Sequence, residues 1–380
     1  MQFLPQGPKL VGTGATGPAS DQGLSIALSG DGNTAILGSP ADNYGVGAAW
    51  VFFRNAGVWA QQSKLVGTGA VGPAQQGISV ALSADGSTAI VGGNADNHSV
   101  GAVWVFTRFS GTWTQQGPKL VGTDAVGAAG QGTSVALSAG AGTIVVGGSE
   151  DNGGVGAAWV FVRGGSGWIQ QGPKLVGTVT GVYPQKQGCV ALSADGTTAI
   201  VGGRDDDGGA GAAWVFVSGG TVWAQQSKLV GTGAVGGAFQ GSSVALSGDG
   251  NTAIVGGWGD YYWAVGAAWV FTRSGSVWTQ QSKLVGAGAL SARQGWSVAL
   301  SADGNTAIVG GPADNGGAGA AWVFTRSGDT WTQGSKLFAT DAVGAAGQGT
   351  SVALSIDGNT AIVGGPTDGS GGAAWVYVRQ

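Results

Sequence analysis

The sequence predicts an all-β protein, a seven-bladed β-propeller with four antiparallel strands in each blade. Three observations predict it. A unit of about 55 residues recurs seven times along the chain of 380 residues, and a period of this length is typical of propeller repeats. Each copy holds four short runs of β-forming residues separated by turn residues. These runs are apolar on both faces, as a blade covered by a neighbour on each side requires.

The repeat is marked by a Lys-Leu pair followed by Val or Phe. The pair begins at Lys9, Lys64, Lys119, Lys174, Lys228, Lys283 and Lys336. We expect residues 1-380 to form one domain, because a propeller hides its apolar blade faces only as a whole ring. The predicted blades are residues 22-66, 77-121, 132-176, 187-230, 241-285, 295-338, and 349-380 together with 1-11.

The sixth copy shows the order of elements within one blade. We expect strands at residues 297–301, 305–309, 320–325 and 331–337, with a glycine-rich loop at 312–319. The dipeptide Asp303-Gly304 predicts a two-residue hairpin whose positive φ angles suit these residues. No helical periodicity separates the strands, which excludes a parallel βαβ architecture.

The two ends of the chain predict how the ring closes. The seventh copy stops after its third strand at residues 375–379, whereas residues 3–10 match the fourth strand of the other copies. Phe3 stands where those copies have Trp. We therefore expect residues 2 to 10 to supply the outer strand of the seventh blade. Each outer strand also carries one of the repeated lysines, interpreted as a charge that discourages edge-to-edge pairing.

Composition excludes several classes of function. Only 9% of the residues are charged, the net charge is −4, and no run of Lys or Arg occurs, so nucleic acid is not an expected partner. No apolar stretch reaches the roughly 18 residues of a membrane span, and a single cysteine, Cys189, allows no internal disulfide. We expect a monomer, secreted or at the cell surface, whose targeting segment is not in this chain; a cytoplasmic location stays open.

The motifs of each copy resemble the FG-GAP repeats of the integrin α-chain head and their bacterial relatives. The pattern is Gln-Gly-x-Ser-Val-Ala-Leu-Ser, then Asp-Gly-Asn-Thr-Ala-Ile-Val-Gly-Gly-Pro, then Gly-Ala-Ala-Trp-Val-Phe. In the seventh copy Gly347-Gln348-Gly349 stands where the family has Phe-Gly, and Gly364-Gly365-Pro366 where it has Gly-Ala-Pro. The resemblance covers all seven copies and implies a propeller that binds rather than catalyses.

The same resemblance raises the question of calcium, because the family often carries an Asp-rich loop in the first turn of the blade. Here that turn keeps one carboxylate, and in the third copy it reads Gly140-Ala141-Gly142. Since Ca²⁺ takes six to eight oxygen ligands, a plain turn is favoured over residual calcium, and no cofactor is expected. We expect the turn aspartates to form rim ion pairs with the arginines that end the third strands: Asp31, Asp85, Asp195, Asp249, Asp303 and Asp357 with Arg54, Arg108, Arg163, Arg273, Arg326 and Arg379.

Departures from the repeat mark the candidate site. They lie in loops of the fourth and fifth copies that belong to one face, where aromatic rings stand beside Asp and Arg. Such a group suits stacking on a sugar or anchoring a protein; packing of the rings on one another, or capping of the channel, stays open. The candidates are Trp258, Asp260, Tyr261, Tyr262, Trp263, Phe239, Arg293, Trp296, Tyr183 and Arg204. The run Asp205-Asp206-Asp207 is interpreted as solvated acids.

Three functions remain after these observations. The first is a non-enzymatic recognition or scaffold module for a protein or glycan, and the second is a lectin that uses the aromatic loops of the fourth and fifth copies. The third is an enzyme at the channel mouth, which has little support because His98 and Glu150 are the only residues of their types. A glycosidase with two Asp residues stays formally open, although no spacing singles out a pair.

Overall fold

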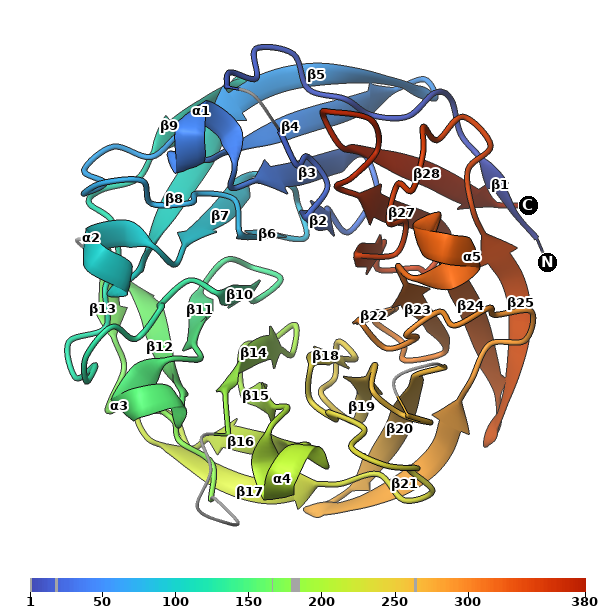
Figure 1. The fold of residues 1–380 in the computed structure, drawn as a ribbon. Coiled ribbons are helices and arrows are strands. Elements are labelled where there is room, and N and C mark those ends of the chain that lie inside the picture. Colours follow the sequence, from blue (N-terminus) through green and yellow to red (C-terminus); the bar gives the residue numbers. More distant parts are fainter. Residues whose placement is uncertain (1, 18–19, 166, 179–184, 263–264) are drawn as a thin grey trace.

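The computed structural model describes residues 2–17, 20–165, 167–178, 185–262 and 265–380. Seven four-stranded antiparallel sheets stand in a ring around a central channel (Figure 1). The seven-bladed propeller is confirmed. In each blade the strands follow one another from the channel outward in chain order, and the outermost strand of the seventh blade is the N-terminal one.

The strands of the seven blades share one layout, with the inner strand first and the outer strand last. They are β2–β5 (Ser25–Leu28, Thr34–Ser39, Ala48–Asn55, Val58–Leu65), β6–β9 (Ser79–Leu82, Thr88–Gly93, Ala102–Phe109, Thr112–Gln115), β10–β13 (Ser134–Leu137, Thr143–Gly148, Ala157–Gly164, Gly167–Gln170), β14–β17 (Gln187–Leu192, Thr198–Gly203, Ala212–Ser218, Trp223–Leu229), β18–β21 (Ser243–Leu246, Thr252–Gly257, Ala267–Ser274, Val277–Leu284), β22–β25 (Ser297–Leu300, Thr306–Gly311, Ala320–Ser327, Thr330–Leu337), and β26–β28 with β1 (Ser351–Leu354, Thr360–Gly365, Ala373–Arg379, Phe3–Pro5).

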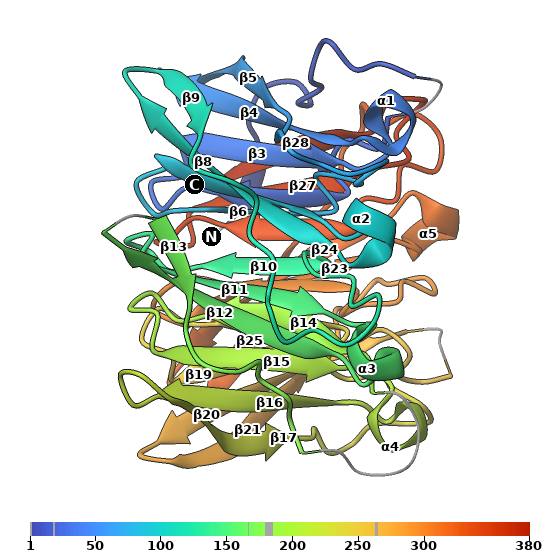
Figure 2. The same cartoon turned by 90° about the vertical axis from the view of Figure 1, so that its left-hand side faces the viewer.

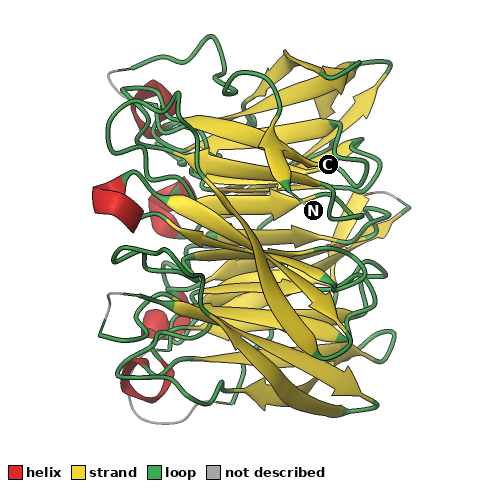
Figure 3. Cartoon of the chain, turned by 90° about the vertical axis from the view of Figure 1, so that its right-hand side faces the viewer, coloured by secondary structure: helices red, strands yellow, loops and turns green. Residues whose placement is uncertain are grey.

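Single helical turns follow the second strand in five blades of the described chain, where the sequence predicts loops. They are α1 (Asp42–Gly45), α2 (Asp96–Ser99), α3 (Asp151–Gly154), α4 (Asp206–Gly209) and α5 (Asp314–Gly317). Each contains two residues with left-handed φ and ψ, which explains why no helical periodicity announces them. All five lie on one face of the ring, which we call the helical face (Figures 2 and 3).

The apolar core lies between the blades. In the second blade Trp104 and Val91, both fully buried, pack against Ile36 and Val51 of the first blade, and the other blade pairs repeat this arrangement. Each sheet is therefore covered on both faces, which explains why its strands are apolar on both sides.

The N-terminal strand closes the ring, as the sequence predicts. β1 pairs antiparallel with β28, with Phe3 opposite Arg379. Further along the chain, Leu10 and Ala374 exchange two backbone hydrogen bonds of 2.7 and 3.1 Å. The two ends of the chain consequently lie side by side (Figures 1 and 3).

A closed circle of backbone hydrogen bonds joins all seven blades on the face opposite the helical face. The N–H of one residue in each first turn donates to the carbonyl oxygen of its counterpart in the next blade, at 2.8–3.0 Å. The circle runs through Gly30, Ala84, Ala139, Ala194, Gly248, Ala302 and Ile356, and returns to Gly30. Six members are Gly or Ala. The side chain of Ile356 occupies the space above Gly30, where a Cβ would come within 2.5 Å of the Ile356 Cδ1 atom.

The first turn of the blade differs from the expected two-residue hairpin. In the first blade it spans residues 29–33 between β2 and β3, and only Gly32 has a positive φ, at 69°. Asp31 accepts hydrogen bonds from the Ser29 hydroxyl at 2.5 Å and the Asn33 N–H at 2.9 Å. The carboxylate therefore stabilises a wider turn, and its own φ stays negative.

These bonds also set the charge state of the turn aspartates. Partial burial would by itself raise the pKa of Asp31, but the hydrogen bonds from Ser29 and Asn33 outweigh it and hold that pKa below its usual value. The pKa is lowered in the same way at Asp85, Asp195, Asp249, Asp303 and Asp357.

The sequence predicts that these aspartates form rim ion pairs with the arginines. That prediction is wrong, because no such pair forms among the described residues. The Arg54 guanidinium instead donates to the Asn33 side chain at 2.8 Å and to Gln6 of the seventh blade at 2.7 Å. It also lies over the Trp59 ring, 5.4 Å from the centroid. Asn33 is held in turn by Asp31, so an amide separates the two charges.

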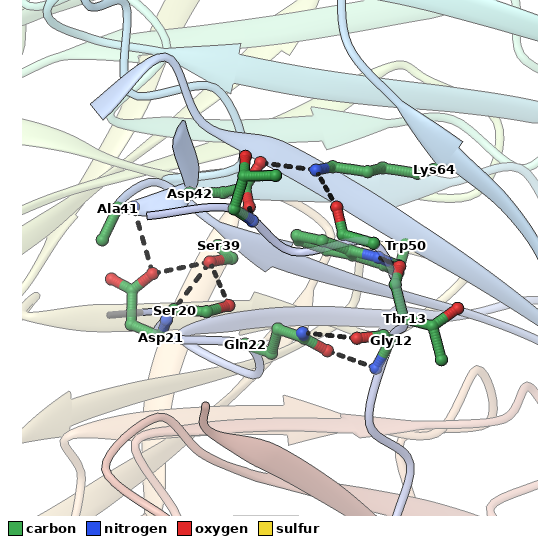
Figure 4. A network of polar contacts seen from close by, with 12 residues as sticks. Gly12, Thr13, Ser20, Asp21, Gln22, Ser39, Ala41, Asp42, Trp50 and Lys64 are labelled. Atoms are coloured by element: carbon green, nitrogen blue, oxygen red, sulfur yellow. Dashed lines mark hydrogen bonds and ion pairs between the residues drawn. The ribbon is translucent and has the colours of Figure 1, made fainter. Parts of the chain in front are cut away.

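The repeated lysines are not free edge charges either. Each pairs with the buried aspartate that begins the turn after the second strand, at 2.5–2.8 Å. In the first blade Lys64 binds Asp42, which is 1% exposed, and lies over the Trp50 ring (Figure 4). The Trp50 Nε1–H donates to the Thr13 carbonyl, and the Gln22 amide bonds both backbone groups of Gly12. The lysines therefore tie outer strands to the helical face.

Most blade interfaces share a further hydrogen bond on the outer rim, and the interface between the sixth and seventh blades lacks it. Elsewhere the outer-strand Trp donates from Nε1 to a Gln of the preceding blade, for example Trp278 to Gln226 at 3.0 Å. At the interface between the sixth and seventh blades, Phe3 stands in place of the Trp and Gly334 in place of the Gln. Tyr377, where other blades have Phe, buries a hydroxyl there without a partner in the described residues.

Candidate binding site at the channel mouth

The mouth of the channel on the helical face is built from equivalent positions of the seven blades. One position follows the Gln-Gly pair just before the first strand, and another follows the second strand. The buried Gln fixes the first by bonding the backbone of the preceding loop, as Gln294 does with Gly286 at 2.6 and 2.9 Å. Side chains at these positions can therefore vary while the backbone beneath them stays the same.

These positions line a cavity of about 360 Å³ that opens at the mouth. Its deeper wall carries the valines and serines of the first strands, such as Val298 and Ser297. Its rim is uneven, because most blades offer different side chains and only the third and seventh share one, a Thr. The rim residues at these two positions are Leu24, Ile78, Thr133, Ser149, Arg204, Ser242, Trp296 and Thr350. Lys186, which precedes the Gln-Gly pair of the fourth blade, also belongs to the rim.

The fourth blade departs most from the common rim. It lacks the residue that follows Gln-Gly in the other blades, so Gln187-Gly188 runs directly into Cys189, and the pairing of β14 with β15 shifts register there. Two cations stand on this side of the mouth. Lys186 forms an ion pair with Glu150 of the third blade, whereas the Arg204 Nε lies 3.8 Å from the nearest Asp205 oxygen.

The wall near these cations contains the thiol of Cys189, in the place of a serine hydroxyl. Burial raises the pKa of Cys189 to about 11, although hydrogen bonds to Val244 and Ser134 and the charge of Arg204 act in the opposite direction. Because burial outweighs the other contributions, the thiol stays protonated at neutral pH.

An aromatic stack adjoins the mouth at the fifth and sixth blades. Phe239 and Trp258 stack with centroids 4.9 Å apart and planes 11° apart, and Trp258 meets Trp296 at 5.6 Å. The Arg293 guanidinium lies 5.8 Å from the centre of the Trp258 ring. The rings do pack on one another, but the outermost, Trp296, keeps 38% of its surface exposed at the cavity.

The structure brings five of the ten sequence candidates together: Phe239, Trp258, Arg293 and Trp296 in the stack, and Arg204 in the same rim. Asp260 does not belong with them. It is 2% exposed and pairs with Lys283 as its counterparts do in every blade, so its role is structural. Asp206 is likewise buried against Lys228, which corrects the interpretation of three solvated acids.

The remaining candidates lie elsewhere. Tyr261 and Tyr262 are exposed and meet each other edge to face at 6.2 Å, outside the cavity lining. Tyr183 and Trp263 lie outside the described residues.

Sequence reasoning missed most of the rim. Leu24, Ile78, Thr133 and Thr350 line the cavity, yet none is an unusual residue type for a loop. The available signal was positional, because all four follow the same Gln-Gly pair. Comparing that one column across the seven copies would have found them.

Known proteins provide no family assignment for this chain. No protein-family model matches it, and a search of curated proteins finds no match. Within the described ranges, no helix is both long and apolar enough to cross a membrane. The same ranges contain no cluster of three or more His, Cys, Asp or Glu side chains placed to hold a metal ion.

Proposed function

We propose that this propeller is a non-enzymatic recognition module that binds its ligand at the channel mouth on the helical face. The observation that carries the proposal is the uneven rim. The blades repeat one backbone, while the aromatic stack and the cations Arg204 and Arg293 all belong to the fourth to sixth blades. Exposed aromatic rings and arginines are the side chains most enriched at recognition sites.

The resemblance to FG-GAP repeats supports binding over catalysis. His98, the sole histidine, lies in α2 and is exposed, and it is absent from the cavity lining. The turn aspartates already accept several hydrogen bonds from their own turn, which favours plain turns over calcium loops. A secreted or surface-exposed protein acting as a monomer remains our proposal.

A lectin is the second candidate, favoured by one feature of the mouth. The exposed ring of Trp296 shares the cavity with the hydroxyls of Thr133, Ser242 and Thr350. Sugars present apolar ring faces that stack on aromatic side chains, and hydroxyls that pair with such groups.

A binding screen with a matched pair of variants tests the proposal. The wild type is applied to a glycan array and to a displayed peptide library, beside Trp258→Ala/Trp296→Ala. Phe109→Ala is the control, because Phe109 is 84% exposed in the hairpin between β8 and β9, away from the mouth. We expect the double variant to lose the binding that the control keeps. Binding retained by a folded double variant would remove the mouth as the site.

A further inference from the structure

We propose that the channel mouth recognises an acidic sugar, a pyranose ring that carries a carboxylate. The proposal rests on the proposed function, because it names the ligand class of the same site. Three features of the rim point to it: a guanidinium that donates no hydrogen bond within the described residues, an exposed indole face, and a set of hydroxyl acceptors around a small cavity.

The guanidinium is that of Arg204. It is 52% exposed, and within the described part of the chain it donates no hydrogen bond, since the Asp205 carboxylate lies 3.8 Å away. No other blade has a cation at this position, where they have Pro40, Asn94, Ser149, Trp258, Pro312 and Pro366. Its planar fork matches a carboxylate in two parallel hydrogen bonds. Arg204 lines the cavity, so a ligand in the cavity would meet it.

The second cation of the fourth blade, Lys186, favours an anionic ligand that is held in one orientation. The Lys186 side chain lines the cavity and is held by Glu150, which is not part of the lining. Lys186 can therefore donate to a ligand carboxylate from a fixed position, while Glu150 balances its charge. A simple anion would use only the cations.

The ring face and the hydroxyls point to a sugar rather than to a peptide carboxylate. Trp296 offers a flat apolar surface that other blades lack at this position. Thr133, Ser242 and Thr350 each donate to a carbonyl of their own loop, which leaves their oxygens free to accept from ligand hydroxyls. A ligand rich in hydroxyl donors satisfies these acceptors.

The size of the cavity agrees with a small ligand. Its volume of about 360 Å³ falls at the lower end of the range for small-molecule sites, roughly 300–1,000 Å³. One or two sugar units fill such a space, whether free in solution or at the end of a chain. A folded protein partner would instead contact the wider helical face.

The test is isothermal titration calorimetry with the full chain and three probes: methyl glucuronide, methyl glucoside and acetate. We expect the glucuronide to bind at least about tenfold more tightly than the glucoside, from hydrogen bonds to a charged group, and more tightly than acetate. Added salt should weaken binding of the two anions, the glucuronide and acetate, and leave binding of the glucoside unchanged. A glucuronide-terminated oligosaccharide then separates a chain end from a free sugar as the natural source.

Variants assign the preference to Arg204. We expect Arg204→Gln to remove the preference for the glucuronide while binding of the glucoside persists, and Arg204→Lys to keep part of it. Arg163→Gln is the matched control, because Arg163 is exposed on the opposite face and carries the same charge. Trp296→Ala should weaken both sugars.

Two results would overturn the inference. If both sugars bind equally and Trp296→Ala abolishes both, the mouth is a binding site but not one for acids. If no probe binds at millimolar concentration, the acidic-sugar inference fails, and the peptide arm of the screen above decides whether the mouth binds at all.

Discussion

The interface between the sixth and seventh blades can be given the rim hydrogen bond that the other interfaces share. The substitutions Gly334→Gln and Phe3→Trp supply its acceptor and donor, and Tyr377→Phe removes the hydroxyl that has no partner in the described residues. The backbone at Gly334 can carry a side chain. A Cβ at Gly334 would meet only the Val323 carbonyl oxygen, at 3.6 Å.

The expected gain follows from the groups involved. One Trp-to-Gln hydrogen bond contributes about 1 kcal/mol, and removal of an unsatisfied buried hydroxyl gains about 1–3 kcal/mol. The free energy of unfolding should therefore rise by about 2–4 kcal/mol. For 380 residues the unfolding entropy near 60 °C is about 0.8 kcal/mol/K, so the melting temperature should rise by about 3–5 °C.

Differential scanning calorimetry on the triple variant, each single variant and the Gly334→Gln/Phe3→Trp pair measures this gain. The pair should exceed the sum of its singles, because neither change makes the bond alone. Phe271→Tyr is the mirror control, since it adds the hydroxyl to an intact interface and should lower the melting temperature. If Tyr377→Phe destabilises the protein, or if the pair is merely additive, our account of this interface is refuted.

Four further outcomes are expected. Deleting residues 2–10 removes β1 and its pairing with β28. Calorimetry should then show a melting temperature lower by more than about 10 °C, the order expected when a strand of core residues is lost. An unchanged melting temperature would refute closure by this strand. Lys119→Met leaves the carboxylate of Asp96, 1% exposed, unpaired, and denaturant titration should show a loss of about 3–5 kcal/mol, which Lys119→Met combined with Asp96→Asn should partly recover. The lowered pKa of Asp303 and its counterparts contributes stability that is complete above the unfolded-state pKa of about 4 and is lost as the pH falls through the folded-state pKa. Asp303→Asn should therefore reduce the slope of unfolding free energy against pH between about 2 and 4. An unchanged slope would contradict the turn geometry. With a pKa of about 11, Cys189 should react with a thiol reagent at pH 8 about 100-fold more slowly in the folded than in the unfolded protein, whereas equal rates would show an ionised thiol.

The fold could be predicted because the same order of strands and turns recurs in every copy of the repeat. Seven Lys-Leu markers count the blades, and the match between residues 3–10 and the outer strands of other copies locates the closing strand. The partner of the marker lysine was missed, although Asp42 stands 22 residues before Lys64 and five other copies have an Asp 22 or 23 residues before their lysine. From sequence alone, a carboxylate in a glycine-rich loop is expected to be solvent-exposed, because the burial of that loop depends on how the blades pack.

The candidate site was predictable only in part, for a related reason. Departures from a repeat show where blades differ, and they drew attention to Trp258 and Trp296, which the structure brings into contact. They do not show which side chains point into the channel. Asp260 belongs to the repeat itself, and its aromatic neighbours made it look special; Leu24 and Thr350 look ordinary, yet line the cavity.

The closed circle of backbone hydrogen bonds has a consequence for how such a mouth can change. Because every link uses main-chain atoms and has nearly the same length, the aperture of the channel is set without help from the residues at the opposite end. The rim residues of the seven blades can then vary while the opposite end of the channel stays fixed. The fourth blade lacks one rim residue and shifts the register of β14 against β15, yet Ala194 keeps its place in the circle. A new ligand preference can therefore arise by exchange of single side chains at the rim.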